Sequence, residues 1–394
     1  MVAYTCHIRR RGRKEVLSCC QKDYYLEKTL EVEEITRGLV LPAKGVDGGV
    51  VSGDRFYEHS SVHREWGKAY EYSVSDICDR DEDVVYVGMW NPAWGHCITD
   101  NIKHLWFLRD ERYAFLRALK WVYIASDTVE SPNFMDLLRL LGVPLERTEK
   151  IGSITRFRKI YLPDDCFVYT KSQRFYTAGY VRLIEYLLSQ VSSENDQATY
   201  PQKIYFSRTD IVQTWQRDTG EERIEKVFKK SGYSIFHPEQ MTIGQQLQLL
   251  THCESFAATE GSVAHNALFL KEGASFICIR KANYCNGYQF PINQMKKLSV
   301  TLIDAHATLS SVQPWWGPFF LYNSRLLQKW AKTGFTPFPL ASYLAYLYRF
   351  EPKINHLKSR SKHIVLNTYA KLAVFARPNK THPADKCICE NEHK

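Results

Sequence analysis

The sequence predicts an α/β protein with two doubly wound domains, because short apolar strands alternate with helices in two separate blocks. The first block runs from the strand "VVYVG" to the long amphipathic segment "RFYTAGYVRLIEYLLSQV", and the second from "KIYFS" to "LSVTLI". The polar, proline-bounded stretch "SSENDQATYPQ" between them is typical of a linker. A chain of 394 residues is also long for one core, which favours two domains.

These patterns predict the domain boundaries. Residues 1–192 are expected to form the first domain, in which residues 1–80 contain β-type runs broken by Gly, Pro and Asp and therefore favour hairpins. Residues 201–305 are expected to form the second domain. Residues 306–380 then make a basic, aromatic, helical extension, and the polar residues 381–394 are expected to be disordered.

Composition is that of an ordinary globular protein, with 44% hydrophobic and 24% charged residues. No stretch of about 18 uncharged apolar residues suggests a spanning helix. The N-terminus lacks the apolar core of a signal peptide. The cysteine count is odd, at eleven, which favours reduced thiols, so a cytoplasmic protein is expected.

Positive charge is concentrated near the C-terminus. Residues 305–380 contain eleven Lys or Arg and one acid, Glu351, whereas the whole chain carries a net charge of +9. Basic aromatic segments of this kind can lie on an anionic membrane surface. The alternative is a pair of helices that packs back across the domains, and the sequence leaves both open.

The turn after the strand "SFAAT" is a candidate anion site, because doubly wound folds bind ligands where strands end. A helix is expected from about residue 263, after the turn Glu260-Gly261-Ser262. Gly261 permits close backbone approach, and the Ser262 hydroxyl could cap the helix or donate to a phosphate. His265 and Asn266 would reach the same anion. The plainer interpretation is that Ser262 only caps and His265 only packs.

Two arginines are predicted at the same sheet edge. Arg208 follows the strand "KIYFS", and Arg217 stands before the next helix. Guanidinium groups suit paired phosphate oxygens, so a diphosphate site is favoured over two unrelated surface arginines.

In the first domain, "CITDNIKHLWFL" is expected to be a helix with Ile98, Ile102, Leu105 and Trp106 on one apolar side. His96 and Asp100 then fall on the opposite side, where one of them could act as a general base. Alternatively, Asp100 only favours the helix start electrostatically and His96 only enters the helix.

Taken in order, these motifs resemble glycosyltransferase family 61, especially its bacterial polysaccharide-synthesis branch, over roughly residues 45–305. The resemblance rests on "WGHCITDNIKHLW", Ser207-Arg208, Pro238-Glu239, Gly261-Ser262 and His265-Asn266. The chain departs from the eukaryotic members, which have His-Gly-Ala-Gly where this chain has Glu-Gly-Ser-Val-Ala-His.

The resemblance implies a GT-B architecture: two Rossmann-like domains facing a cleft, with the acceptor side on the first and the nucleotide sugar on the second. It also implies inversion at the anomeric carbon, no essential metal and no cofactor besides the donor, which is expected to be UDP-linked. The sequence agrees in one respect, since no Asp-x-Asp stands at a strand end. The acidic "DRDED" at 79–83 precedes the first strand and is interpreted as a solvated loop.

The predicted function is therefore a hexosyl- or pentosyltransferase that extends a bacterial surface glycan, such as capsule, lipopolysaccharide or exopolysaccharide. Its acceptor is expected to be lipid-linked and reached at the inner face of the cell membrane. The candidate bases are Asp100, His96 and Glu260. The candidate donor-binding residues are Arg208, Arg217, Ser207, Glu239, Gly261, Ser262, His265 and Asn266.

Two other functions remain open from the sequence. One is a pyruvyl- or other group transferase on the same scaffold, since a fold does not fix its chemistry. The other is a non-enzymatic basic protein that binds surfaces through a degenerate cleft. Nucleic acid is not an expected partner.

Overall fold

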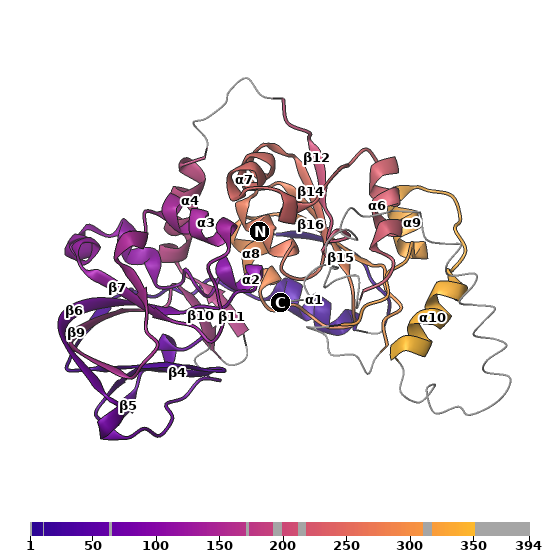
Figure 1. Cartoon of the computed structure of the whole chain (residues 1–394). Coiled ribbons are helices and arrows are strands. Elements are labelled where there is room, and N and C mark those ends of the chain that lie inside the picture. The colour runs from indigo at the N-terminus through magenta and orange to yellow at the C-terminus, as the bar shows by residue number, and fades with distance from the viewer. Residues whose placement is uncertain are drawn as a thin grey trace, which may run out of the picture. The chain divides into compact units, whose positions relative to one another are not determined.

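The computed structural model describes residues 2–10, 12–62, 65–170, 173–191, 199–211, 218–309 and 317–350. The chain divides into two compact units, Met1–Phe335 and Thr336–Lys394. The predicted disordered tail, 381–394, lies outside the described residues. The first unit contains two large sheets, a two-stranded hairpin and the helices that cover them (Figure 1).

The first sheet is mixed. Its central strands run parallel in the order β9-β6-β7-β8, and antiparallel hairpins extend it beyond β9. A hairpin is thus confirmed for residues 39–56, where glycines and polar residues alternate with Val and Leu. The strands are β2 (Val32–Thr36), β3 (Leu39–Lys44), β4 (Asp47–Ser52), β5 (Arg55–Phe56), β6 (Cys78–Met89), β7 (Lys120–Ile124), β8 (Thr148–Lys150) and β9 (Thr155–Pro163).

Helices and a small hairpin cover this sheet on the side of the second one. Helix α3 begins after Ser131, whose hydroxyl accepts a hydrogen bond from the backbone N–H of Phe134, and ends at Gly142 in the left-handed conformation. Its apolar face is buried against the core. The elements are α3 (Pro132–Leu141), β10 (Phe167–Thr170), β11 (Gln173–Tyr176) and α4 (Ala178–Ser189). The connections around the first sheet also contain 3-10 helices at Glu58–Ser60, Val74–Asp76, Glu111–Ala118 and Leu145–Arg147.

The acidic segment "DRDED" is not a solvated loop, as the sequence suggested, but part of β6. Its carboxylates pair with arginines on the neighbouring strand β9: Asp79 lies 3.3 Å from Arg156, and Asp83 lies 2.7 Å from Arg158. Cross-strand ion pairs let a charged run continue the sheet at its exposed end.

The second sheet is entirely parallel, in the order β1-β16-β15-β14-β12-β13. Residues 3–7 fall within the range expected for the first domain. They instead form the edge strand of the second sheet, where they pair in parallel with β16. The strands are β1 (Ala3–His7), β12 (Lys203–Phe206), β13 (Ser234–Phe236), β14 (Ser255–Thr259), β15 (Ser275–Arg280) and β16 (Ser299–Asp304); the helices are α1 (Arg13–Gln21), α6 (Glu221–Lys230), α7 (Ile243–His252) and α8 (Gln289–Met295).

The two sheets share one continuous hydrophobic core. Trp106 and Tyr180 from the first side belong to the same buried cluster as Phe206 and Phe256 from the second. Helices α3 and α7 also contact each other, and the Asn133 amide donates to the Met241 carbonyl at 3.0 Å. The α/β class is therefore confirmed, with one parallel and one mixed sheet packed together.

The expected helix over residues 97–108 is wrong. A single turn, α2 (Trp94–Cys97), is followed by turns and by a 3-10 helix, Leu105–Arg109. Side chains here replace helical backbone hydrogen bonds. The Asn101 side chain accepts from the backbone N–H of Asn91 and donates to its carbonyl, both at 2.9 Å. The Thr99 hydroxyl donates to the Gly95 carbonyl. As a result the side chains of Lys103 and His104 are buried.

The helix expected from residue 263 is also shorter than predicted. It is a 3-10 helix of six residues, Ala264–Phe269, and all six are buried. It is too short and too tightly enclosed to provide the free N-terminal amides of a long helix. Another 3-10 helix, Pro238–Gln240, precedes α7.

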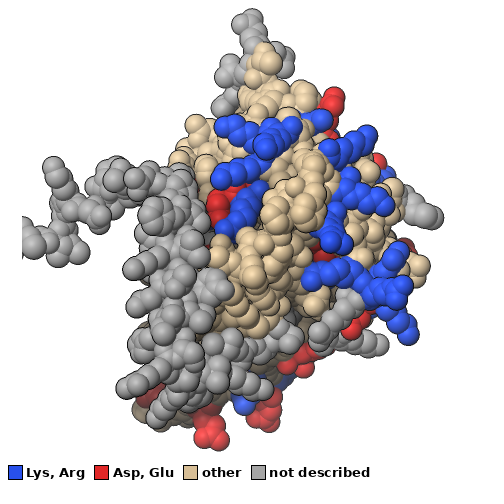
Figure 2. Space-filling model, turned by 90° about the vertical axis from the view of Figure 1, so that its right-hand side faces the viewer, with Lys and Arg blue, Asp and Glu red and all other residues tan. Residues whose placement is uncertain are grey.

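The first part of the expected C-terminal extension packs on the second sheet. Helix α9 (Arg325–Ala331) contacts β16 and β1, and Trp330 lies 5.1 Å from Phe228 of α6. Figure 2 faces the side of the molecule that carries α6 and α9, and Lys and Arg side chains gather there. The exposed basic residues of these two helices are Lys226, Lys229, Lys230, Arg325 and Lys329.

The second unit contains α10 (Leu340–Phe350), an amphipathic helix rich in aromatic residues. In the described part of the chain, none of the helices has the length and hydropathy needed to cross a membrane. The remainder of the basic extension, from residue 351, lies outside the described residues.

Candidate functional site

The second sheet has a point at which the strand order reverses. From β12, the chain adds β13 on one side and then returns to add β14, β15 and β16 on the other. In open parallel sheets, the carboxyl ends of the two strands at such a point leave a crevice where ligands bind. Here those ends carry Ser207-Arg208 after β12 and Glu260-Gly261 after β14. The fold therefore places two predicted motifs side by side.

A cavity of about 560 Å³ lies at this point. Its walls come from the segments that build the first sheet and from those that build the second. Its lining residues include Trp94, Ser131, Asn133, Arg208, Glu239, Gln246, Ser262 and Asn266. A larger hollow of about 770 Å³ is found at the opposite sheet edge, beside Gln202, Glu254 and Ser299, where strands begin. We take the smaller cavity as the site, because ligands of such sheets bind where strands end.

Arg208 lies at the cavity in a dense polar network. Its Nη2 donates to Asp218 at 2.8 Å and to Glu221 at 3.4 Å, and its Nε donates to Thr259 at 3.2 Å. The side chain is only 17% exposed. The two carboxylates fix the guanidinium in place and offset part of its charge.

A second cation, Lys281, lies beside the turn and is not among the predicted site residues. Lys281 follows β15 and is buried, and a Cβ built on Gly261 would lie 3.3 Å from its Nζ. Burial lowers the pKa of Lys281 to about 8, and Arg208 acts in the same direction. Within the described ranges, its ammonium makes no hydrogen bond or ion pair. The ammonium does lie over the Phe319 ring, 4.3 Å from its centroid. A buried ammonium without an anionic partner is still costly, which points to an anionic ligand.

The turn itself depends on two glycines. Gly261 has φ of 119°, which disfavours any side chain, and Ser262 beside it is exposed at the cavity. A Cβ on Gly95 would lie 2.8 Å from His265 Nδ1 and 3.0 Å from Ser262 Oγ. Glycine at position 95 thus lets the loop after β6 touch the turn after β14.

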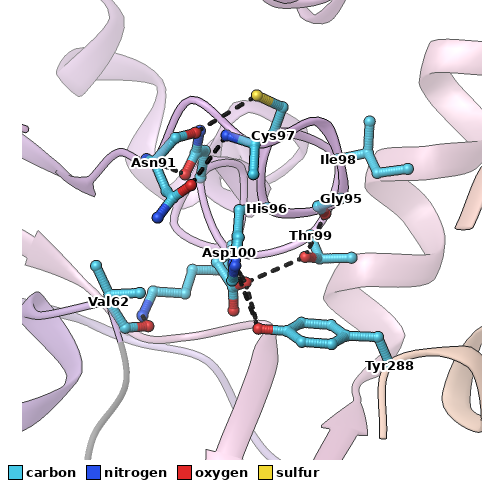
Figure 3. A network of polar contacts seen from close by, with 12 residues as sticks. Val62, Asn91, Gly95, His96, Cys97, Ile98, Thr99, Asp100 and Tyr288 are labelled. Carbon is cyan, nitrogen blue, oxygen red and sulfur yellow. Dashed lines mark hydrogen bonds and ion pairs between the residues drawn. The ribbon is translucent and has the colours of Figure 1, made fainter. Parts of the chain in front are cut away.

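His96 and Asp100 form a close pair next to this contact. His96 Nδ1 lies 2.5 Å from Asp100 Oδ2, and the Tyr288 hydroxyl donates to the same oxygen at 2.7 Å (Figure 3). Thr99 Oγ1, whose proton goes to the closer Gly95 carbonyl, lies 3.2 Å from the same oxygen. Asp100 is 3% exposed and His96 is 26% exposed, so the imidazole is the member of the pair that solvent and substrate can reach.

His265 is buried at the centre of these groups. Its ring lies 5.5 Å from that of Tyr288. Burial lowers the pKa of His265 to about 3, with His96 acting in the same direction. It is therefore neutral near pH 7. Its neighbour Asn266 accepts a hydrogen bond from the Trp94 indole at 2.9 Å and so ties the two halves together.

Three predicted site residues lie elsewhere or are not described. Ser207 is fully buried and donates to Glu225, away from the cavity lining. Glu260 is buried behind the turn, where burial raises its pKa, and its carboxylate faces the backbone of Lys281 at 3.5 Å. Arg217 lies outside the described residues.

Glu239 lies at the cavity rim in a group with metal-binding character. Its carboxylate, that of Asp210 and the imidazole of His237 offer ligand atoms within 4.8 Å of one another. His237 Nδ1 is 3.5 Å from Asp210 and 3.8 Å from Glu239. Burial raises the pKa of Glu239. Among the described residues this group is the one able to hold a divalent ion.

Residues 94–277 match the Glycosyltransferase 61 family model. The matched region contains the His96–Asp100 pair, Arg208 and the Gly261-Ser262 turn, and it ends just before Lys281. No curated protein matches the chain. The match supports a glycosyltransferase with a sugar donor and a glycan acceptor, and the α/β architecture is compatible with that class.

Proposed function

We propose that the protein is an inverting glycosyltransferase that moves a sugar from a nucleotide sugar to a hydroxyl of a bacterial surface glycan. In this proposal the two sheets act as the two halves of a GT-B enzyme. One observation carries it: the His96–Asp100 pair and the cations Arg208 and Lys281 flank the same turn at the reversal point of the second sheet. A base for the acceptor and positive charge for the leaving group are what direct displacement requires.

His96 is the proposed base, and Asp100 orients it. Because Nδ1 bonds the buried carboxylate, that nitrogen carries the proton, and Nε2 carries the lone pair that would take the acceptor's proton. The acceptor oxygen attacks the anomeric carbon, its proton passes to Nε2, and the bond from that carbon to the diphosphate breaks. A single displacement of this kind inverts the anomeric configuration. Asp100 stabilises the imidazolium that results.

The leaving nucleoside diphosphate is proposed to be held by side-chain cations without a divalent ion. Arg208 lines the cavity, and the ammonium of Lys281 lies at the Gly261 turn. The hydroxyl of Ser262 is exposed at the same place. Glu239 at the rim is proposed to contact the nucleoside.

Release of nucleoside diphosphate from nucleotide sugars tests this function. We expect the full-length protein to hydrolyse one nucleotide sugar of a panel, or to transfer the sugar from it, and the panel begins with UDP-sugars. Most of that activity should remain in EDTA. The anomeric configuration of the product, measured by NMR, should be opposite to that of the donor.

The control is His237→Ala, which breaks the group that could hold a metal at the cavity rim. If cations alone stabilise the leaving group, this variant should respond to EDTA as the parent does. Complete loss of activity in EDTA that manganese restores in the parent but not in His237→Ala would instead assign the leaving group to a bound metal. Turnover of phosphoenolpyruvate but of no nucleotide sugar would favour the group transferase.

We also propose that the basic region contacts an anionic membrane, where a lipid-linked acceptor would be located. Support comes from the exposed Lys and Arg residues of α6 and α9 (Figure 2) and from the basic extension beyond them. We expect the protein to sediment with phosphatidylglycerol-containing vesicles more than with neutral ones, and salt to weaken this binding. A variant with Lys226, Lys229 and Lys230 changed to Gln shows whether the α6 surface or the C-terminal extension makes the contact with the vesicles. Equal, negligible binding to both vesicle types would reject the membrane contact.

A further inference from the structure

Arg174 is a buried cation without a carboxylate partner. It lies on β11, is 9% exposed, and donates from Nη2 to the Tyr288 hydroxyl at 2.7 Å. Its Nε has no hydrogen-bond partner, and its guanidinium makes no ion pair with any carboxylate of the described ranges. A guanidinium carries five N–H donors, so most of its capacity is unused.

The guanidinium is nevertheless held firmly. It stacks on the Tyr288 ring with 3.5 Å between its central carbon and the ring centroid, and it lies 4.5 Å from the centroid of Tyr169. Tyr169 in turn contacts Trp66 edge-on, and Trp66 is 55% exposed. The arginine is thus held on aromatic faces, and Tyr169 separates it from the exposed Trp66.

The nearest compensating charge acts only indirectly. Tyr288 accepts from Arg174 and donates to Asp100, so a neutral hydroxyl separates the guanidinium from that carboxylate. Asp100 Oδ2 is already engaged by His96 and Thr99. Burying a cation without a direct counter-charge is costly, and buried charges in folded proteins are generally paired. An oxyanion bound to the free N–H groups would complete this pairing, with the two-pronged geometry that arginine favours.

We propose that Arg174 binds a carboxylate or phosphate group of the acceptor, so that the acceptor is anionic. This inference rests on the proposed function, because the Tyr288 hydroxyl contacts both Arg174 and the His96–Asp100 pair. An acceptor anchored at Arg174 would present a neighbouring hydroxyl to His96. The oxyanion has two possible sources, a uronic acid in the glycan or the phosphate of a lipid-linked carrier.

The test compares charged and neutral probes on the full-length protein saturated with UDP, which keeps the anions away from the donor site. Ligand-observed NMR measures the affinities of methyl glucuronoside against methyl glucoside, and of glycerol phosphate against glycerol. We expect at least one anion to bind about tenfold more tightly than its neutral partner. Preference for the glucuronoside alone indicates a glycan carboxylate, and preference for glycerol phosphate alone indicates a phosphate group.

Arg174→Met should bring each charged probe to within about twofold of its neutral partner, and Arg174→Lys should keep part of the preference. The matched control is Arg147→Met, an exposed arginine paired with Glu146. UDP affinity should be unchanged in all three variants, and failure of the parent to bind UDP would count against the proposed function instead. The inference is overturned if the parent prefers neither anion, or if the preference survives in Arg174→Met. It is also overturned if Arg174→Met and Tyr288→Phe lower transfer equally without changing probe preference, since Arg174 would then only position Tyr288.

Discussion

Replacing His96 with alanine is expected to lower the turnover number about 10²–10⁴-fold and to leave nucleoside diphosphate affinity nearly unchanged. The imidazole is the more exposed member of the His96–Asp100 pair, and Nε2 carries the lone pair that would take the acceptor's proton. A base acts only as the new bond forms, so its loss affects the transition state rather than the bound donor. Turnover at saturating substrates and UDP affinity by calorimetry measure the two quantities.

Asp100→Asn should also lower turnover, because an amide cannot stabilise the imidazolium and can hold the ring in the wrong tautomer. His252→Ala is the control, since His252 bonds a carbonyl of its own helix, that of Gln248, at 2.8 Å. Near-normal turnover in His96→Ala with strong loss in Asp100→Asn would move the base to the carboxylate. If both variants stayed active, the base would lie elsewhere, and Glu260→Gln would be examined next.

The strands were predictable because their sequences are short apolar runs with turn residues at both ends. The runs "KIYFS" and "SFAAT" form β12 and β14, where the pattern placed them. Helices α3, α6 and α7 are predictable in the same way, since each has an apolar face with a period near 3.6 and a recognisable start. The position of β1 was not predictable, because pairing with β16 joins segments nearly 300 residues apart.

The two segments that carry the site departed most from prediction. Residues 97–108 and 263–269 have helical patterns, yet both are buried all round and built from turns and 3-10 helices. Tertiary packing and side-chain bonds such as those of Asn101 outweigh helix propensity there. Local departures of this kind are expected where function constrains the chain.

Site residues that follow a strand could be found from the sequence, whereas those brought in by the fold could not. Arg208 and Ser262 stand at strand ends, and both line the cavity. Lys281 also follows a strand, and applying the same rule to "SFICIR" would have identified it. Arg174 and Tyr288 had no such signal, because a hairpin strand and a helix start bring them to Asp100 from distant positions.

Replacing Lys281 with methionine is expected to weaken nucleoside diphosphate binding at least about tenfold at pH 7, with little effect on the bare nucleoside. A charge-assisted hydrogen bond is worth about 1.5–3 kcal/mol, and methionine keeps the volume while removing the charge. Arg208→Ala should weaken binding at least as much, since it removes one cation and leaves Asp218 and Glu221 beside the phosphates. The double variant should lose about 100-fold or more if the two effects are independent.

The pH dependence of binding separates Lys281 from Arg208. Because the pKa of Lys281 lies near 8, its ammonium is charged at pH 7 and loses its proton as the pH rises through that value. Affinity for nucleoside diphosphate should therefore fall between about pH 7.5 and 9.5, whereas affinity for the nucleoside should not. Lys281→Arg keeps the charge at every pH in this range and should abolish the decline. Calorimetric titrations across this range would reject the assignment if Lys281→Met bound the diphosphate as tightly as the parent, or if the decline persisted in Lys281→Arg.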